Sequence, residues 1–149
     1  MNFQFKKYRD DDNTEIKKLI TDLYREDSCG EPMTEDKINK TLHELESRPD
    51  KGSVWIFIYK NRIVGYSILI NYWSNEHGGN ILAIDEIYVK PSFRNRGIGS
   101  AFIRFIISNS DVSVKLLTLE VTPENNKAFK YYKNKGFTLS GNRHMIKKL

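Results

Sequence analysis

Two adjacent carboxylates stand a few residues before a basic turn with two glycines, and together these residue types could carry acid–base chemistry beside a bound anion. The carboxylates are Asp85 and Glu86, and the turn runs from Arg94 through Gly97 to Gly99. Backbone N–H groups in the first turn of a helix lack intrahelical partners and carry partial positive charge, so phosphate oxygens bind there. Glycine allows the close approach, and arginine adds cationic charge. The turn therefore predicts a bulky phosphorylated cofactor.

The spacing of the glycines excludes two familiar phosphate-binding motifs. A Walker loop needs G-x-x-x-x-G-K-[ST] and a dinucleotide fingerprint needs G-x-G-x-x-G, whereas Gly97–Phe102 has the sequence G-I-G-S-A-F. The pattern that does match is R-x-x-G-x-G, from Arg94 to Gly99. Together with the preceding Ile87–Pro91, it resembles the acetyl-CoA-binding signature of the GNAT N-acetyltransferase superfamily.

A second block of residues strengthens this resemblance. Asn125, Ala128, Tyr132, Gly136 and Phe137 match the later motif of that superfamily, N-x-x-A-x-x-x-Y-x-x-x-G-F, at the expected spacing. A strand-like segment, residues 116–121, lies between the two motifs. The resemblance covers residues ~53 to 148, and over residues 1–50 it is only architectural.

The resemblance implies a single domain, residues 1–149, with acetyl-CoA as the acetyl donor. A backbone N–H near Val89 is expected to bind the thioester carbonyl. The residues expected to bind the cofactor are Ile87, Tyr88, Val89, Arg94, Asn95, Arg96, Gly97, Ile98, Gly99, Ser100 and Asn125.

Transfer of an acetyl group from a thioester to an amine needs a base for the amine, stabilisation of the oxyanion and an acid for the departing thiolate. A lysine-like amine has a pKa near ~10.4 in water, so a carboxylate must take its proton, directly or through water. Consecutive strand residues face opposite sides, but the resemblance implies a bulge here that re-aims side chains. We therefore favour Glu86 as base, with Asp85 orienting the amine. The alternative is that one carboxylate forms a salt bridge with Arg94 or Arg96.

The resemblance makes Tyr132 the general acid. An isolated tyrosine at helical spacing is usually a core aromatic, but the surrounding motif favours a catalytic role. Tyr131 would lie about 100° around the helix, on a different face. Asn125 could contact the cofactor's pantetheine arm or cap its own helix, and the two roles are compatible.

Charge is distributed unevenly along the chain. Residues 1–50 carry 9 Lys and Arg against 13 Asp and Glu, whereas residues 51–149 carry 15 against 6. A basic part suits polyanionic CoA and an acidic part suits a cationic amine, although both could be ordinary solvated surfaces. The residues expected at the amine side are Glu31, Tyr72, Trp73 and Glu76. They fit a polyamine, an aminoglycoside-like amine, an amino acid or a protein lysine or N-terminus, without choosing among them.

Other function classes fit the sequence less well. The pI of 9.2 allows a nucleic-acid-binding module, but no RNA- or DNA-binding signature is present, so no nucleic-acid partner is expected. A CoA-binding regulatory domain without turnover is a further alternative. The three histidines lack metal-ligand spacing, so no metal site is expected. The single cysteine, Cys29, looks inert, and the absence of an apolar leader or membrane span favours a cytoplasmic setting. The resemblance also allows a homodimer.

The elements that must position these residues follow from hydrophobic periodicity, capping residues and turn signals. They predict an α/β (α+β) fold with a mixed sheet. The resemblance implies a GNAT-like arrangement, in which a central mixed sheet of about six to seven strands is flanked by about four helices. Strands are expected near 3–8, 54–59, 63–70, 81–89 and 116–121, with a final strand that includes Met145 and Ile146. Helices are expected near 13–25, 34–48, after Gly99 and at 125–135, and a loop at 71–80.

Overall fold

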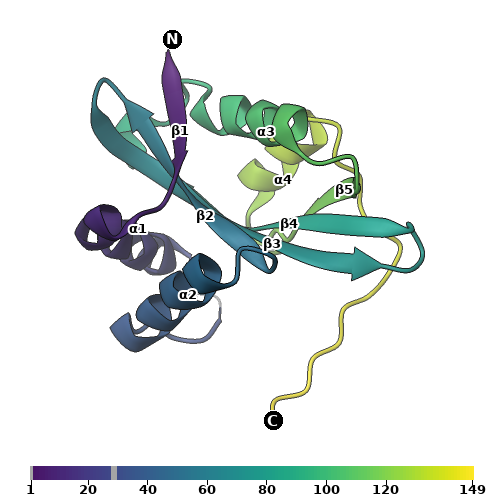
Figure 1. The fold of residues 1–149 in the computed structure, drawn as a ribbon. Helices are drawn as coiled ribbons and strands as arrows, with labels where there is room; N and C mark the ends of the chain where they lie inside the picture. Colours follow the sequence, from purple (N-terminus) through teal and green to yellow (C-terminus); the bar gives the residue numbers. More distant parts are fainter. Residues whose placement is uncertain (1, 28–29) are drawn as a thin grey trace.

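The computed structural model describes residues 2–27 and 30–149, and a mixed sheet lies at its centre (Figure 1). The strand order is sequential, and β4 and β5 run parallel whereas the other neighbours are antiparallel. The mixed sheet is thus confirmed. The strands are β1 (Phe3–Lys7), β2 (Gly52–Tyr59), β3 (Arg62–Ser74), β4 (Gly79–Val89) and β5 (Val114–Leu119).

Four helices cover the sheet, as expected from the sequence. In Figure 1, α1 and α2 lie on one side of it and α3 and α4 on the other. Two short 3-10 turns, η1 (Asp10–Asp12) and η2 (Pro91–Phe93), precede α1 and α3. The helices are α1 (Asn13–Glu26), α2 (Glu35–Ser47), α3 (Ile98–Asn109) and α4 (Asn126–Lys133).

The helix boundaries follow from local chemistry. The side chain of Thr34 accepts a hydrogen bond from the Lys37 backbone N–H at the start of α2, so Thr34 is the predicted N-cap. The same helix ends at Ser47, two residues before Pro49, as proline restricts the residue that precedes it.

The sheet separates two hydrophobic cores. On the α1–α2 side, Tyr66 and Tyr88 pack with aliphatic side chains of both helices. On the other side, Phe57 and Phe102 are fully buried beneath α3. Strands β3 and β4 approach closely at Gly65, where a Cβ would lie only 2.3 Å from the Tyr88 carbonyl oxygen. The carboxyl end of β4 is therefore held firmly from one edge.

The expected loop at residues 71–80 is largely strand. β3 continues to Ser74 and β4 begins at Gly79, which leaves only a tight turn with Gly78 at φ +61°. The cross-strand partners Tyr72 and Ile81 extend the hairpin despite the polar composition of this segment.

The expected final strand through Met145 and Ile146 is wrong for this structure. Both side chains are more than 90% exposed, and the backbone of residues 138–149 makes no hydrogen bond with another described segment. Without a partner the segment is extended but is not a strand. The sheet of the described residues therefore has five strands and not six to seven.

Candidate active site

A β-bulge lies at the paired carboxylates. Ile68 of β3 faces Glu86 and the next residue, Leu69, faces Ile84, so Asp85 has no partner across the strand pair. The extra residue locally breaks the alternation of side chains. The bulge expected beside the cofactor is thus present, with Asp85 as the inserted residue.

Two tyrosine hydroxyls hold the Glu86 carboxylate. Tyr24 of α1 donates to one oxygen and Tyr66 of β3 donates to the other, each at 2.7 Å. Burial raises the pKa of Glu86, and the two hydrogen bonds partly offset this by stabilising the charged form. Each carboxylate oxygen retains a lone pair for a further proton donor. The arrangement suits a proton acceptor whose orientation is fixed.

Asp85 lies in a different environment. Its side chain is exposed, yet partial burial and the nearby charge of Glu120 raise its pKa. Among the described residues neither Asp85 nor Glu86 forms an ion pair. The alternative salt bridge to Arg94 is wrong, since Arg94 pairs with Glu26 instead.

The carboxyl half of β4 has one free edge. Pairing with β5 ends at Ile84 and Leu119, whereas β4 continues to Val89. The Lys90 N–H bonds to Val64 of β3, and consecutive N–H groups of a strand point to opposite sides. The N–H groups of Ile87 and Val89 are therefore directed away from β3, toward the side that β5 has left. This is the edge expected to bind the thioester carbonyl and the pantetheine arm.

The predicted phosphate turn has the necessary backbone conformation. Asn95 and Gly97 have positive φ angles of 59° and 80°, and α3 begins directly after Gly97 without a side-chain cap. The first intrahelical bond at this end joins the Ala101 N–H to Gly97, so the three preceding N–H groups have no intrahelical acceptor. The segment is largely exposed, and a Cβ at Gly97 would meet no atom within 4 Å. Its donors fit the phosphates of CoA.

Arg94 forms an ion pair with Glu26 of α1. Its guanidinium donates to both Glu26 oxygens at 2.7 and 2.9 Å, and its Nε donates to the Val89 carbonyl at 2.8 Å. The Tyr88 hydroxyl also donates to Glu26. Arg96 instead donates to the Ser92 carbonyl and lies over Phe93. Of the two arginines in the motif, Arg96 is the one without a carboxylate partner among the described residues.

Three residues of helix α1 contact β4 or the segment that follows it. Tyr24 contacts Glu86, Glu26 contacts Arg94, and Glu15 pairs with Lys90 at 2.5 Å. These links attach the helix of the expected amine side both to the candidate base and to the phosphate turn.

Helix α4 brings two tyrosines against the start of α3. Asn125 caps α4 by accepting from the Ala128 N–H at 3.0 Å, which confirms its capping role. The Tyr131 hydroxyl bonds to the Ser100 hydroxyl at 2.9 Å. Tyr132 packs against Phe137 and the Tyr131 ring.

Tyr132 has the properties of a proton donor. Burial, with a smaller contribution from Tyr131, raises the pKa of Tyr132 to about 12. Within the described residues the Tyr132 hydroxyl has no hydrogen-bond partner. Every fully buried polar side-chain atom of these residues does have a partner, so the Tyr132 hydroxyl is not among the fully buried atoms. With this pKa, the hydroxyl is protonated at neutral pH.

The candidate acid and base belong to opposite sides of the sheet. Glu86 bonds to a tyrosine of α1, whereas Tyr132 belongs to the core beneath α3. The sheet that contains β4 lies between the α1–α2 layer and the α3–α4 layer (Figure 1). An amine could thus approach from the α1–α2 side, and a CoA thioester from the α3–α4 side.

The four residues expected at the amine side do not converge. Tyr72 and Trp73 are 50% and 65% exposed near the tip of the β3–β4 hairpin, and Glu76 lies in its turn. Tyr72 pairs with Ile81, which lies five positions from Glu86, or about 17 Å along a strand. Glu31, between α1 and α2, pairs with Lys148. Ser28 and Cys29 lie outside the described residues.

Sequence reasoning missed the residues that hold the others in place. Tyr24 and Tyr66 bind Glu86, Glu26 binds Arg94, and Glu120 acts on Asp85. The available signal was a phenol hydroxyl within the apolar strand at Tyr66 and on the apolar face of α1 at Tyr24, since a buried tyrosine needs a polar partner.

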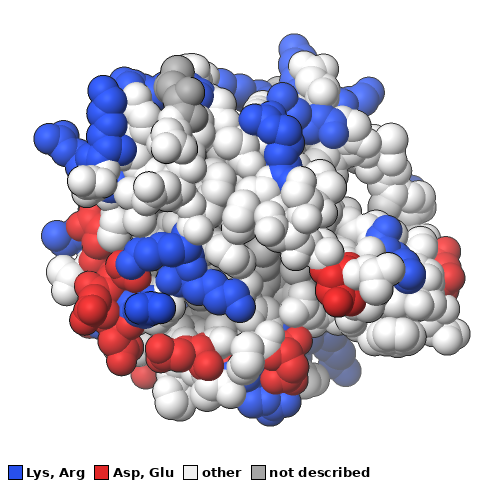
Figure 2. Space-filling model, turned by 45° about the horizontal axis from the view of Figure 1, so that its top comes forward, with Lys and Arg blue, Asp and Glu red and all other residues white. Residues whose placement is uncertain are grey.

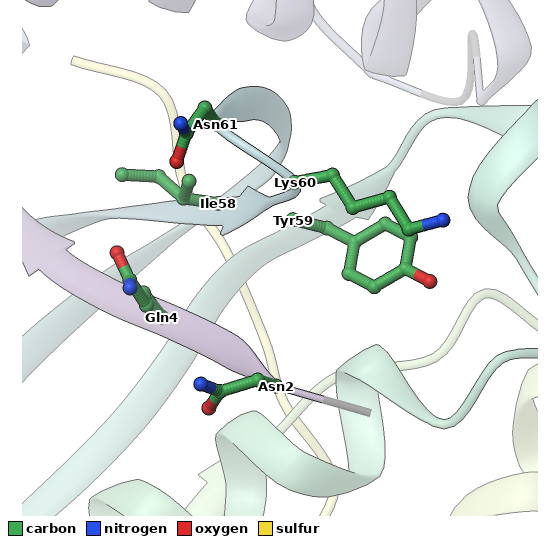
Figure 3. Close-up of a pocket in the computed structure, with 6 residues that line it drawn as sticks. All are labelled: Asn2, Gln4, Ile58, Tyr59, Lys60 and Asn61. Atoms are coloured by element: carbon green, nitrogen blue, oxygen red, sulfur yellow. The ribbon is translucent and has the colours of Figure 1, made fainter.

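Two surface hollows lie apart from these residues. One of about 420 Å³ lies where β1 meets the end of β2, and Figure 3 shows amide side chains on its β1 wall. Another of about 300 Å³ lies between α1 and α2. Neither is lined by the candidate acid or base. The first hollow is lined by Asn2, Gln4, Ile58, Tyr59, Lys60 and Asn61.

Basic residues do not form a continuous surface on the face shown in Figure 2. Lys and Arg lie in separate groups there, with uncharged area between them, while Asp and Glu lie mainly toward the lower left and the bottom, with smaller groups at the right. A nucleic-acid backbone is usually bound by a continuous basic patch or stripe.

No helix among the described residues has the length and apolar character needed to cross a membrane.

Comparison with known proteins identifies the class. Residues 14–137 match the model of the acetyltransferase (GNAT) family. The match includes the bulge, the phosphate turn and α4. The chain belongs to the GNAT acetyltransferase family.

Curated relatives match part of the chain. It is 34% identical over 84 residues to an uncharacterised N-acetyltransferase of Methanocaldococcus jannaschii. This match covers 53% of this chain and 37% of that protein. It is 36% identical over 75 residues to the Bos taurus thialysine N-epsilon-acetyltransferase, covering 50% and 44%. Each match thus spans less than half the length of the curated relative.

Solved structures share the fold over nearly the whole chain. A possible acetyltransferase from Clostridium difficile 630 superposes with a TM-score of 0.87 at 22% identity, covering 100% of this chain and 99% of the other. The aminoglycoside acetyltransferase AAC(6')-Iy, in complex with a bisubstrate analogue, gives 0.81 at 17% identity with the same coverage. At these identities the similarity shows the fold alone.

The Glu26–Arg94 pair leads to a prediction about CoA affinity. We expect Glu26→Gln to lower the Kd for CoA about 2–5-fold, because it frees the Arg94 guanidinium and removes a negative charge beside the phosphate turn. Isothermal titration calorimetry measures this. Glu44→Gln is the matched control, since Glu44 of helix α2 also forms an ion pair, with Lys51, but does not contact the phosphate turn. An unchanged or larger Kd for Glu26→Gln alone would show that Glu26 does not compete with phosphate.

Proposed function

We propose that the protein is an acetyl-CoA-dependent N-acetyltransferase that acetylates a primary amine by direct transfer in a ternary complex. The proposal is supported by two side chains suited to proton transfer, which belong to opposite sides of the sheet. Glu86 is oriented by two tyrosines on one side of the sheet. Tyr132, protonated at neutral pH, belongs to the other side.

Acetyl-CoA would be held by the phosphate turn and by the free edge of β4. The N–H groups of Ile98, Gly99 and Ser100 would bind the phosphates, and Arg96 adds charge beside them. The N–H groups of Ile87 and Val89 are available for the pantetheine arm and the thioester carbonyl. When bound, acetyl-CoA supplies the activated acetyl group.

Glu86 would accept the proton of the incoming ammonium, directly or through one water. Its raised pKa brings it nearer to neutral pH, where a general base works best. Asp85, on the bulge, would attract and orient the cation. Because Tyr24 and Tyr66 already fix the carboxylate, little reorganisation is needed when the amine binds.

Tyr132 would hold a proton at its phenolic oxygen for the leaving sulfur. Its pKa of about 12 keeps the phenol neutral at physiological pH. Tyr131 would have a different task, since its hydroxyl bonds to Ser100 beside the phosphate turn.

The acceptor is proposed to be a cationic amine. The acids Asp85, Glu86 and Glu120 lie near one another at the end of the paired part of β4 and β5. A related protein is named for thialysine and a structural neighbour for aminoglycosides, both of which carry amines. A polyamine, an aminoglycoside, an amino acid with a side-chain amine and a protein amine all match this chemistry.

The test is thiol release from acetyl-CoA with a panel of polyamines, aminoglycosides, lysine-like amino acids and lysine peptides. We expect turnover with one amine class, and acetylated product of the matching mass. If CoA binds but no amine is acetylated, the regulatory alternative is favoured. Salt-dependent binding of nucleic acid without CoA binding would favour the third function class.

A further inference from the structure

The last residues of the chain form a tail, residues 138–149, that reaches the acids proposed to receive the amine. In Figure 1 the tail, in yellow, passes from the α3–α4 side of the sheet to the α1–α2 side. Its side chains contact the body at two acids. His144 contacts Glu120 at 3.5 Å, and Lys148 contacts Glu31 between α1 and α2. Both contacts join a basic residue of the tail to a carboxylate.

The contact with Glu120 brings the tail close to the candidate base. β5 pairs with β4 up to Leu119 and Ile84, so Glu120 and Asp85 directly follow the last residue pair of two neighbouring strands. Such strands lie about 5 Å apart. The charge of Glu120 acts on Asp85, and Asp85 adjoins Glu86 in the chain. The His144 ring therefore lies on the side of the site where these acids gather.

The tail can shift along the body at little cost. The backbone of residues 138–149 makes no hydrogen bond with another described segment. The four side chains of the two contacts are at least 60% exposed, and exposed ion pairs contribute little to stability. Lys147 and Lys148 lie three and four residues beyond His144, a span of at most about 14 Å. A shift of that length would bring either ammonium to the acids beside Glu86.

Charge and tethering both favour this approach. The tail carries Arg143, His144, Lys147 and Lys148 and no acidic residue, so the acids of the amine side attract it. A group tethered by a short flexible segment has an effective concentration on the order of mM. A free amine would have to be present at about that concentration to reach the site as often as a lysine of the tail.

We propose that the protein acetylates its own tail at Lys147 and Lys148, within a single chain. The inference rests on the proposed function, because it uses the same acetyl-CoA site, base and acid. It adds a covalent modification of this chain and names a peptide lysine as one acceptor of the site.

The reaction is a complete acetyl transfer from the thioester to the lysine Nζ. The bond from Nζ to the acetyl carbon forms, and the bond from that carbon to sulfur breaks. The ammonium gives one proton to Glu86, directly or through water, and Glu86 passes it to solvent. Tyr132 protonates the departing thiolate and regains its proton from the nitrogen of the new amide. The products are an uncharged acetyl-lysine and free CoA, so each lysine reacts once.

Fragmentation mass spectrometry of the intact protein is the first test, after incubation with acetyl-CoA and no added amine. We expect acetyl groups on Lys147 and Lys148. Lys40 of α2 is the matched control, because it is 76% exposed and forms an ion pair with Asp36, much as Lys148, 81% exposed, does with Glu31. Lys40 should stay unmodified, and the double variant Lys147→Arg, Lys148→Arg should lose the product. Equal modification of Lys40 would mean non-enzymatic acetylation and would overturn the proposal.

The rate of tail acetylation tests the role of the active site and of the tether. Glu86→Gln is expected to slow tail acetylation about 10²-fold, and an unchanged rate would contradict the proposal. Transfer within one chain proceeds at the same fractional rate at any protein concentration. We expect this from about 1 to about 100 µM, well below the effective concentration of a tethered amine. A fractional rate that rises in proportion to protein concentration would show transfer between copies and would overturn the proposal.

The amine panel separates the failure of this inference from the failure of the proposed function. Turnover of a panel amine with an unmodified tail would overturn the inference and leave the proposed function in place. Binding of CoA with neither a panel product nor a modified tail would overturn both. Tail acetylation that depends on Glu86 supports both, whichever panel amine is also acetylated.

Discussion

Replacing Tyr132 with phenylalanine is expected to lower kcat for amine acetylation about 10²–10³-fold, with little change in the KM for acetyl-CoA. In the proposed mechanism, the variant loses the proton that the phenol would donate to the leaving sulfur. Its fold should be intact, because the ring packs against Phe137 and the hydroxyl bonds to no described residue. Steady-state kinetics with the amine found in the panel, together with thermal unfolding, measure both effects.

Tyr131→Phe is the matched control for this experiment. It removes the hydrogen bond to Ser100 beside the phosphate turn, so it should raise the KM for acetyl-CoA more than it lowers kcat. With a pKa of about 12, Tyr132 is expected to produce no falling limb below about pH 11, so the variant is compared with the wild type by kcat and not by the shape of the pH profile. Full turnover in Tyr132→Phe would mean that another group is the acid.

Replacing Glu86 with glutamine is expected to lower kcat/KM for the amine about 10²–10³-fold at neutral pH. A general base works in its ionised form, so the wild-type rate should rise as pH passes through the pKa of Glu86. Burial raises that pKa, so this limb should lie above the ordinary range of a glutamate. The glutamine variant should lack the limb altogether. A pH series of kcat/KM tests both statements.

Tyr24→Phe gives this prediction a sharper control. The Tyr24 hydroxyl lowers the pKa of Glu86 by bonding to its charged form, so its loss should shift the acid limb to higher pH. A merely structural role of Tyr24 would change stability without moving the limb. Asp85→Asn should lower kcat/KM less than Glu86→Gln does, since the Asp85 side chain is exposed and no described side chain hydrogen-bonds to it. If both carboxylate variants kept full activity, ordered water alone would have to deprotonate the amine.

Local sequence signals were sufficient for much of the fold. The apolar periodicity of residues 13–25 and the cap at Thr34 predicted α1 and α2 nearly to the residue. The glycine turn was predicted together with the start of α3, because glycine permits the left-handed backbone that Gly97 adopts before the helix. These features depend on neighbours in the chain, and such neighbours are visible in a sequence.

Features that depend on distant partners were not predictable in this way. Tyr24 and Glu86 are 62 positions apart, and nothing local to either residue indicates their hydrogen bond. The hairpin through residues 71–80 is longer than its polar composition indicated, because cross-strand pairing outweighs local preference. The segment around Met145 has the residue types of a strand but no partner within the described chain.

The links of α1 to β4 and to the segment that follows it have a consequence for anyone who redesigns the acceptor preference of this protein. A helix grafted from a relative in place of Asn13–Glu26 would alter the amine side and would also remove Glu15, Tyr24 and Glu26. Such a chimaera would then bind donor and acceptor with altered affinity at once, so a gain in selectivity would be masked by lost turnover. Grafts that retain these three side chains would change the expected amine side without disturbing Glu86, Lys90 or Arg94. Libraries built on that rule should yield active variants more often.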